Sequence, residues 1–197
     1  MPPEGFYRKK LLHATLFFAK NTKYLGKVKL AKLLHYLDFN HFKQTGYPSI
    51  GLKYKTYPFG PLPEDFWREV ADGVTPPDFA GFLKLKKTND TSNAVWFNAV
   101  RDPDMDLFSP REVEIMTLLA QKYNNHNAEM MIKDSHADDQ PWAKMVERFG
   151  KNRKMNIPYK LVLDNKGDVS EKEAMERLTE FFIMLDNFDL HPAKQQG

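Results

Sequence analysis

Residues 25–45 read LGKVKLAKLLHYLDFNHFKQT, and Gly46 follows them. At about 100° per residue, a helix built from this stretch has one narrow polar face. That face carries Lys29, Lys32, Tyr36, Asn40 and Lys43. Most of the remaining circumference is apolar: Val28, Leu30, Leu33, Leu34, Leu37, Phe39 and Phe42. Because this apolar arc is wider than the stripe of a surface helix, the stretch predicts a buried central helix on which the other elements pack.

Three polar residues interrupt the apolar arc at every third position: His35, Asp38 and His41. Two imidazoles and a carboxylate on neighbouring turns are compatible with a partial metal site or with a base held by a carboxylate. However, His35 and His41 are almost two turns apart, whereas the usual helical pair of metal ligands is i, i+4. A buried carboxylate must also be paired. We therefore expect a structural network without metal, in which Asp38 accepts from a histidine and from backbone or tyrosine donors.

The segment after Gly46 has the pattern of strands and turns. Leu52 to Tyr57 alternates in polarity, as a half-buried strand does. The three prolines between residues 58 and 63 are expected to prevent regular pairing there and to fix the backbone around Gly60. Residues 82–86 and 94–98 flank a turn-rich connection, which predicts a β-hairpin. Together with Leu52 to Tyr57, this hairpin predicts a small three-stranded sheet.

Further helices are indicated by apolar steps of three and four residues and by start and stop signals. They are expected at about Tyr7–Lys20, Glu64–Ala71, Pro110–Tyr123, Asn127–Ile132, Pro141–Phe149 and from Ser170 onward. The predicted class is α+β and mainly α: a helical bundle around the buried central helix, with a small antiparallel sheet made of a hairpin plus one strand. We expect one domain over residues 1–197, in which 151–197 form a strap and a terminal helix.

Composition narrows the functional classes. The chain has no cysteine, so thiolate metal sites and cysteine nucleophiles are excluded. It has no run of 18 apolar residues and no signal-peptide pattern, which predicts a cytoplasmic protein without membrane contact. A net charge of +3 does not indicate nucleic-acid binding. One lysine cluster, at positions 20, 23, 27, 29 and 32, is interpreted as a solvated face, with an acidic partner surface or phosphates as the alternative.

No pattern of residues indicates catalysis. Ser135 and His136 with Asp138 or Asp139 supply a hydroxyl, an imidazole and a carboxylate, yet neighbours in sequence rarely form a triad. We assign Ser135 and His136 to structural polar contacts near Trp142 instead. Gly60 lies in no phosphate-binding motif. The expected protein is not an enzyme and has no cofactor and no metal.

Three runs of sequence resemble one family. Residues 32–42, residues 51–63, and Ser135-His136 with Trp142 look like the Panacea domain, also called the SocA-like domain, over about residues 10–150. Members of that family act as antitoxins, and one is a proteolytic adaptor for its toxin. The resemblance implies a type II antitoxin that neutralises its cognate toxin, encoded beside it, by direct binding. Two alternatives stay open: an adaptor that delivers the toxin to a AAA+ protease, and a DNA-binding regulator.

The expected docking surface combines two places. In the terminal helix, the core stripe is Ala174, Leu178, Phe181, Phe182 and Leu185. This stripe leaves Ile183 and Met184 without assigned burial, so they invite a partner. At the proline turn, Phe59 is held with little entropy left to lose on binding. We expect the toxin to meet Ile183, Met184 and Phe59 together, with a homodimer seam or packing against the strap at 157–163 as the competing interpretations.

Overall fold

The computed structural model of the chain describes residues 5–88, 94–164 and 169–188. Its α-helices are α1 (Phe6–Asn21), α2 (Lys27–Thr45), α3 (Glu64–Glu69), α4 (Pro110–Tyr123), α5 (Ala128–Ser135), α6 (Pro141–Phe149) and α7 (Glu171–Phe188). Its strands are β1 (Tyr54–Tyr57), β2 (Gly60–Pro63), β3 (Leu83–Lys87) and β4 (Val95–Ala99). Short 3₁₀ helices are η1 (Pro77–Phe79), η2 (Met105–Leu107) and η3 (Tyr159–Val162). The predicted class, α+β and mainly α, is confirmed.

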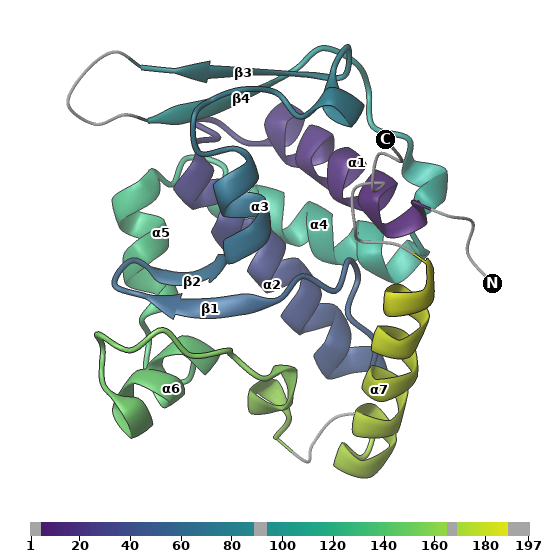
Figure 1. Ribbon diagram of the computed structural model, residues 1–197, viewed down its shortest axis with the longest axis vertical. Helices are drawn as coiled ribbons and strands as arrows, with labels where there is room; N and C mark the ends of the chain where they lie inside the picture. Colours follow the sequence, from purple (N-terminus) through teal and green to yellow (C-terminus); the bar gives the residue numbers. More distant parts are fainter. Residues whose placement is uncertain (1–4, 89–93, 165–168, 189–197) are drawn as a thin grey trace, which may run out of the picture.

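Helix α2 runs through the centre of the molecule (Figure 1). Contacts to it come from α1, α4, α5, α7, β2, β4 and η3. Leu33, Leu34 and Leu37 have no exposed surface. The helix ends at Gly46, which has a left-handed backbone and donates its N–H to the carbonyl of Phe42 at 2.8 Å. The buried central helix predicted from its wide apolar arc is therefore confirmed.

The strands form two separate hairpins instead of the predicted three-stranded sheet. β1 pairs antiparallel with β2, and β3 with β4. The free edge of β1 is occupied by residues 155–157: Thr56 donates its N–H to the carbonyl of Met155, and Ile157 donates to that of Tyr54, each at 2.9 Å. The β3–β4 hairpin lies across α1 (Figure 1). The three-stranded prediction is wrong because a distant segment of the chain takes the edge that the hairpin was expected to fill.

Strand β2 pairs regularly although it contains two prolines. Pro61 lies opposite Thr56, and Pro63 lies opposite Tyr54. The carbonyl of Pro61 accepts from Nζ of Lys32 at 2.8 Å, so the backbone polar groups of Pro61 face away from β1. Pro63, two residues on, shares this orientation. A proline removes a ladder hydrogen bond only where its nitrogen faces the partner strand. The expectation that these prolines prevent pairing is therefore wrong.

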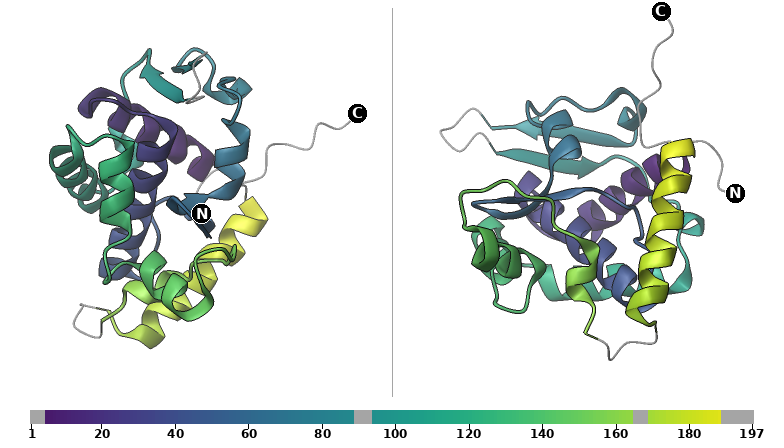
Figure 2. Two further views of the ribbon diagram at one scale, coloured as in Figure 1. Left: turned by 90° about the vertical axis from the view of Figure 1, so that its left-hand side faces the viewer. Right: turned by 60° about the horizontal axis from the view of Figure 1, so that its bottom comes forward.

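Helix α7 packs along one side of α2 and against η3 (Figure 2). Its buried residues are Ala174, Leu178, Phe181 and Leu185. Gly51 permits the close approach, because a Cβ added there would lie 2.9 Å from Cδ1 of Leu185 and 2.8 Å from Cζ of Phe181, and closer still to Cε1 of that ring. Arg177 donates to the carbonyl of Thr45 at 2.6 Å and joins α7 to the end of α2.

The predicted helix starts are confirmed where side chains cap them. Ser109 and Glu112 form a complete capping box at α4, and the side chain of Asn127 accepts from the N–H of Met130 at α5. At α7, the hydroxyl of Ser170 accepts from the N–H of Glu173 at 3.3 Å. Among the helices in the described ranges, none combines the length and the apolarity needed to cross a membrane.

Candidate functional site

Asp38 is the most densely hydrogen-bonded of the residues singled out in the sequence. Its side chain is fully buried. One oxygen, Oδ1, accepts from the N–H groups of Ile50 (2.6 Å) and Gly51 (3.0 Å). The other, Oδ2, accepts from the N–H of Leu52 (3.1 Å) and the hydroxyls of Tyr54 (2.9 Å) and Tyr159 (3.2 Å). Burial raises the pKa of Asp38, against the opposing effect of these hydrogen bonds. Asp38 thereby holds residues 50–52, which lead into β1, against α2.

The two histidines of α2 do not join Asp38, so the expected histidine donor is wrong. His35 is buried between Phe39, at 4.2 Å between ring centroids, and Tyr54, at 5.1 Å. Neither of its ring nitrogens has a hydrogen-bond partner among residues 5–88, 94–164 and 169–188, and burial lowers its pKa well below the usual value. His41 instead uses Nδ1 to contact the carbonyl of Tyr47 at 2.8 Å. Among the described residues, no three His, Asp or Glu side chains are grouped closely enough to hold a metal ion.

Ser135 and His136 lie beside the β1–β2 turn and not beside Asp38. The imidazole of His136 stacks on Trp142 at 3.7 Å, with the ring planes 8° apart. Trp142 in turn donates its Nε1–H to the carbonyl of Tyr57 at 2.9 Å. Ser135 donates its hydroxyl to the carbonyl of Ile132 at 2.9 Å. The contact of His136 with Trp142 agrees with the role predicted for it, whereas of the three polar residues of α2 only Asp38 forms the network at the start of β1.

Two lysines of the supposed solvated face are buried, and that interpretation is wrong for them. Lys29 has 1% of its surface exposed and Lys32 has none. The ammonium of Lys29 donates to the carbonyls of Lys23 (2.6 Å) and Asn124 (3.0 Å), and burial lowers its pKa to about 8. Burial also lowers the pKa of Lys32 well below the usual value. Neither side chain is placed to meet phosphates or an acidic partner.

The turn between β1 and β2 is held from below by Lys32. Gly60 has φ +95°, a left-handed conformation that favours glycine. A Cβ added at Gly60 would lie 2.5 Å from Oγ of Ser135 and 2.7 Å from Nζ of Lys32. The bond from Lys32 to the carbonyl of Pro61 and the bond from Trp142 to that of Tyr57 fix the turn that presents Phe59, which is 54% exposed. Phe59 is thus an exposed ring on a rigid support.

The expected combined docking surface is not continuous. Ile183 is 57% exposed, whereas Met184 is half-buried. The two are about 100° apart around the helix axis and face different sides. The tip of the β1–β2 hairpin, which carries Phe59, points away from α7, and only the base of the hairpin lies near that helix (Figures 1 and 2). Phe59, Ile183 and Met184 therefore do not form one patch.

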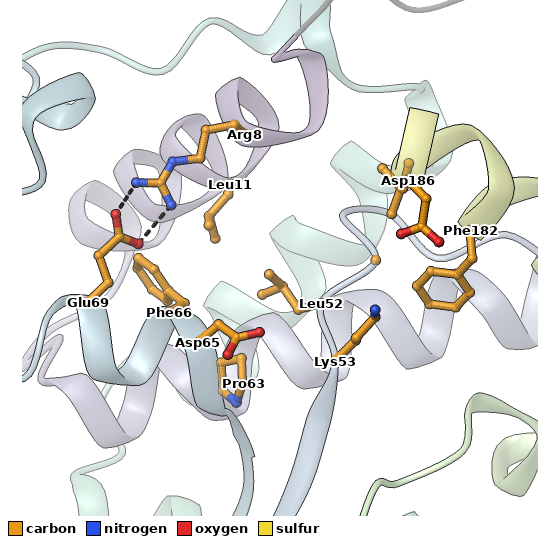
Figure 3. A pocket seen from close by; sticks show the side chains of 12 residues that line it. Arg8, Leu11, Leu52, Lys53, Pro63, Asp65, Phe66, Glu69, Phe182 and Asp186 are labelled. Carbon is orange, nitrogen blue, oxygen red and sulfur yellow. Dashed lines mark hydrogen bonds and ion pairs between the residues drawn. The ribbon is translucent and has the colours of Figure 1, made fainter. Parts of the chain in front are cut away.

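A pocket of about 470 Å³ opens between the base of the hairpin and three helices (Figure 3). We call it the α1–α3–α7 pocket. It is lined by Arg8 and Leu11 of α1, by Gly51, Leu52 and Lys53 before β1, by Pro63, by Asp65, Phe66 and Glu69 of α3, and by Phe182, Leu185 and Asp186 of α7. Leu11, Leu52 and Phe66 are buried and form its apolar floor. Its volume falls within the usual range for binding sites.

Charged side chains surround the mouth of the pocket. Arg8 donates to both oxygens of Glu69, at 2.5 and 2.8 Å, and to both oxygens of Asp78, at 2.7 and 3.0 Å. These carboxylates raise the pKa of Arg8, although burial opposes them. The guanidinium thus joins α1 to α3 and to η1, and it is neutralised there. Asp65, Lys53 and Asp186 carry the remaining charges of the lining.

Sequence reasoning missed the α1–α3–α7 pocket. Its lining comes from four segments, and each segment alone has an ordinary pattern. Asp65 and Glu69 are the acidic i, i+4 neighbours expected on a solvated face of α3, and Arg8 is one basic residue of an amphipathic helix. One weak signal was present, because the terminal helix carried more apolar residues than a single buried stripe needs.

Fold and site together define a mainly helical α+β domain with a pocket whose floor is apolar and whose mouth is charged. The chain belongs to the antitoxin SocA-like, Panacea domain family, whose sequence model matches residues 30–143. The resemblance noted from the motifs is thereby confirmed, and membership indicates an antitoxin role with a toxin as partner. Searches of curated proteins and of solved structures found no match.

The match to the family covers only part of the pocket. Residues 30–143 include Gly51, Leu52, Lys53 and the lining residues of α3. Arg8 and Leu11 of α1, and all the lining residues of α7, lie outside the matched range. The pocket therefore combines a wall from the family segment with walls from elements on either side of it.

Proposed function

We propose that the chain is the antitoxin of a type II toxin–antitoxin pair and that it neutralises its toxin, encoded by the neighbouring gene, by direct binding. The observation that carries the proposal is the α1–α3–α7 pocket, an apolar concavity of about 470 Å³ at the surface of a domain from an antitoxin family. In this proposal the antitoxin acts by covering a surface of the toxin. It therefore needs no catalytic residue and no cofactor.

The exposed side of α7 extends this surface. Ile183 precedes Asp186, which lines the pocket, by three residues. Residues three apart on a helix are neighbours, so Ile183 lies at the rim of the pocket. Ile183, which is 57% exposed, adds apolar surface to the edge of the pocket, and contiguous exposed apolar surface is what protein-binding sites present. The toxin is therefore expected to contact Ile183 and the pocket together.

Co-expression tests the proposal directly. The product of the neighbouring gene is induced alone and with the chain, and growth and co-purification are measured. We expect growth arrest without the chain, recovered growth with it, and a stable complex of the two proteins. Recovered growth with an undiminished amount of toxin supports neutralisation by binding. Recovery that depends on a AAA+ protease and on loss of the toxin contradicts direct neutralisation and indicates the adaptor function instead.

A pair of matched variants tests the surface. Ile183→Asp places a charge at the rim of the pocket. The control, Leu118→Asp, places the same charge on α4, outside the pocket lining, where Leu118 is equally exposed at 57%. Both variants should keep the fold, because neither side chain is buried. We expect Ile183→Asp to weaken toxin binding at least about tenfold, as burying an unpaired carboxylate against apolar surface does, and Leu118→Asp to leave it unchanged. Equal binding by both variants contradicts the placement at α7.

A further inference from the structure

We infer that the α1–α3–α7 pocket binds an amphipathic helix of the toxin whose apolar face enters the pocket and whose basic side chain is held between Asp65 and Asp186. The inference rests on the proposed function and adds the chemistry of the partner. It is carried by the apolar floor, by the balance of charges at the mouth, and by the helices that form the walls.

The floor of the pocket requires an apolar occupant. Leu11, Leu52 and Phe66 are each less than a tenth exposed, and the ring of Phe182 forms part of the α7 wall. None of these four side chains has a polar atom that could orient a small polar ligand. Small-molecule sites normally place a few polar groups inside the pocket to fix the ligand. In this pocket the charged groups stand at the mouth, which favours a protein segment that inserts apolar side chains and keeps its polar groups at the rim.

The charges at the mouth favour a cation. Arg8 already has four hydrogen bonds to the carboxylates of Glu69 and Asp78, so it offers no free positive charge. Within the described part of the chain, neither Asp65 nor Asp186 forms an ion pair, and Lys53 has no carboxylate partner either. Two unpaired carboxylates against one ammonium leave a net negative mouth on a protein whose overall charge is +3. The complementary partner therefore carries a basic group at this point.

The two carboxylates stand on different walls. Figure 3 shows Asp65 on α3 and Asp186 on α7, on opposite sides of the opening, with Lys53 between them. An arginine or lysine that enters the opening between these walls is attracted by both carboxylates, whose joint charge exceeds that of Lys53, and a hydrogen bond to either one is charge-assisted. Apolar anchors one turn away on the same helix then point to the floor, in the way an amphipathic helix fills a groove between helices.

The two walls of the pocket differ in their relation to the family match, which bears on how a member of the family could be specific for its own toxin. Asp65 lies in the segment that matches the family, whereas Asp186 lies 43 residues past its end. A basic side chain held between them interacts at once with the segment that matches the family and with α7, which lies outside the match. Specificity for a particular toxin is then set by the α7 wall and the rim residue Ile183, and the α3 wall supplies the shared half of the site.

Charge reversal provides the test. The double variant Asp65→Lys/Asp186→Lys is compared with Glu114→Lys/Asp138→Lys, which makes the same change of net charge at exposed positions away from the pocket. Circular dichroism establishes that both fold, and calorimetry measures binding to the full-length product of the neighbouring gene. We expect the pocket variant to bind at least about tenfold more weakly than the wild type, because a charge-assisted contact is lost and a repulsion is gained. The control variant should bind within about twofold, since exposed charges far from an interface contribute little.

Reciprocal reversal in the partner identifies the basic residue. Each lysine and arginine of the neighbouring gene's product is changed to glutamate and tested against the double variant. We expect one substitution, on an amphipathic helix, to restore binding to within about threefold of the wild-type pair, because an attractive pair of opposite polarity replaces the repulsion. Restoration by no substitution overturns the inference. Equal binding by the wild type and the pocket variant also overturns it but leaves the proposed function standing. Only failure of the wild-type chain to bind the product contradicts the proposed function itself.

Discussion

Replacement of Asp38 by asparagine tests how the segment before β1 is held against the central helix. The carboxylate accepts from three backbone N–H groups and two tyrosine hydroxyls, all of them buried. Asparagine has the same shape but keeps only one acceptor oxygen, and its amide nitrogen is a donor. The oxygen can still serve Ile50 and Gly51. The amide nitrogen then faces Leu52, Tyr54 and Tyr159, which are all donors in the wild type.

The structure sets the size of the effect. Tyr159 keeps its second acceptor, the carbonyl of Leu52 at 2.7 Å, so two donors lose their partner: the N–H of Leu52 and the hydroxyl of Tyr54. Each buried donor without an acceptor costs about 1–3 kcal/mol. Part of this cost is offset because the variant no longer buries a charge, and burial is what raises the pKa of Asp38. We expect a net loss of about 2–4 kcal/mol in the free energy of unfolding.

Urea unfolding followed by circular dichroism measures this loss, with thermal unfolding as a second readout. At about 2–4 °C per kcal/mol for a chain of this length, the melting temperature should fall by roughly 10 °C. Asp138→Asn is the control: it makes the same chemical change at an exposed position and should stay within about 0.5 kcal/mol of the wild type. An Asp38→Asn variant as stable as this control would refute the reasoning, because the bonds from Leu52 and Tyr54 to the carboxylate would then contribute nothing.

Three further variants probe other parts of the fold. Gly60→Ala should cost at least about 2 kcal/mol in urea unfolding, because alanine is strained at φ +95° and its Cβ meets Ser135 and Lys32; a loss below 0.5 kcal/mol would contradict the tight turn. The pKa of Lys29 is about 8 in the folded protein and 10.5 in the unfolded chain. Between pH 8 and pH 10.5 the unfolded state therefore binds more protons than the folded state. The free energy of unfolding rises with pH in this range, by up to about 1.4 kcal/mol per pH unit. Lys29→Met should remove the contribution of Lys29 to this pH dependence, measured by urea unfolding at pH 8, 9 and 10. An unchanged pH dependence would assign the titration to another group. Trp142→Phe should cost about 1 kcal/mol through loss of the bond to Tyr57, measured by thermal unfolding, and a neutral result would show that the bond adds nothing.

The sequence predicted those parts of the fold that depend on local signals. The capping box at Ser109, the cap at Asn127 and the stop at Gly46 each act within four residues, and the helices begin and end where these signals lie. The central helix was also predictable, because a wide apolar arc leaves only a narrow face for solvent. Local hydrogen bonds and helical periodicity depend only on residues that are close in sequence, so they can be predicted from a single sequence.

The failures at the buried lysines, at the edge of β1 and at the pocket share a different cause, since each depends on a partner far along the chain. Lys32 looks like a surface lysine until the carbonyl of Pro61 is placed beside it, and Lys29 likewise needs the carbonyl of Asn124. The free edge of β1 had two candidate partners, and only tertiary packing selects residues 155–157. The α1–α3–α7 pocket requires α1 and α7, which lie at opposite ends of the sequence. No window of sequence contains both members of any of these pairs.

The strap over β1 has a consequence for synthesis of the chain. Tyr159 follows Asp38 by 121 residues, and ribosomes add about 5–20 residues per second, so the last donor of Asp38 arrives about 6–24 s after the acceptor. Within this interval, from the synthesis of Tyr57 until residues 155–157 follow, the edge of β1 that later pairs with them is open. An open strand edge is a template for pairing with other chains, and on a polysome the nearest other chain is a second nascent copy. Translation of the strap is therefore the step that ends this exposure, and a pause before residue 155 lengthens the time in which nascent chains can aggregate.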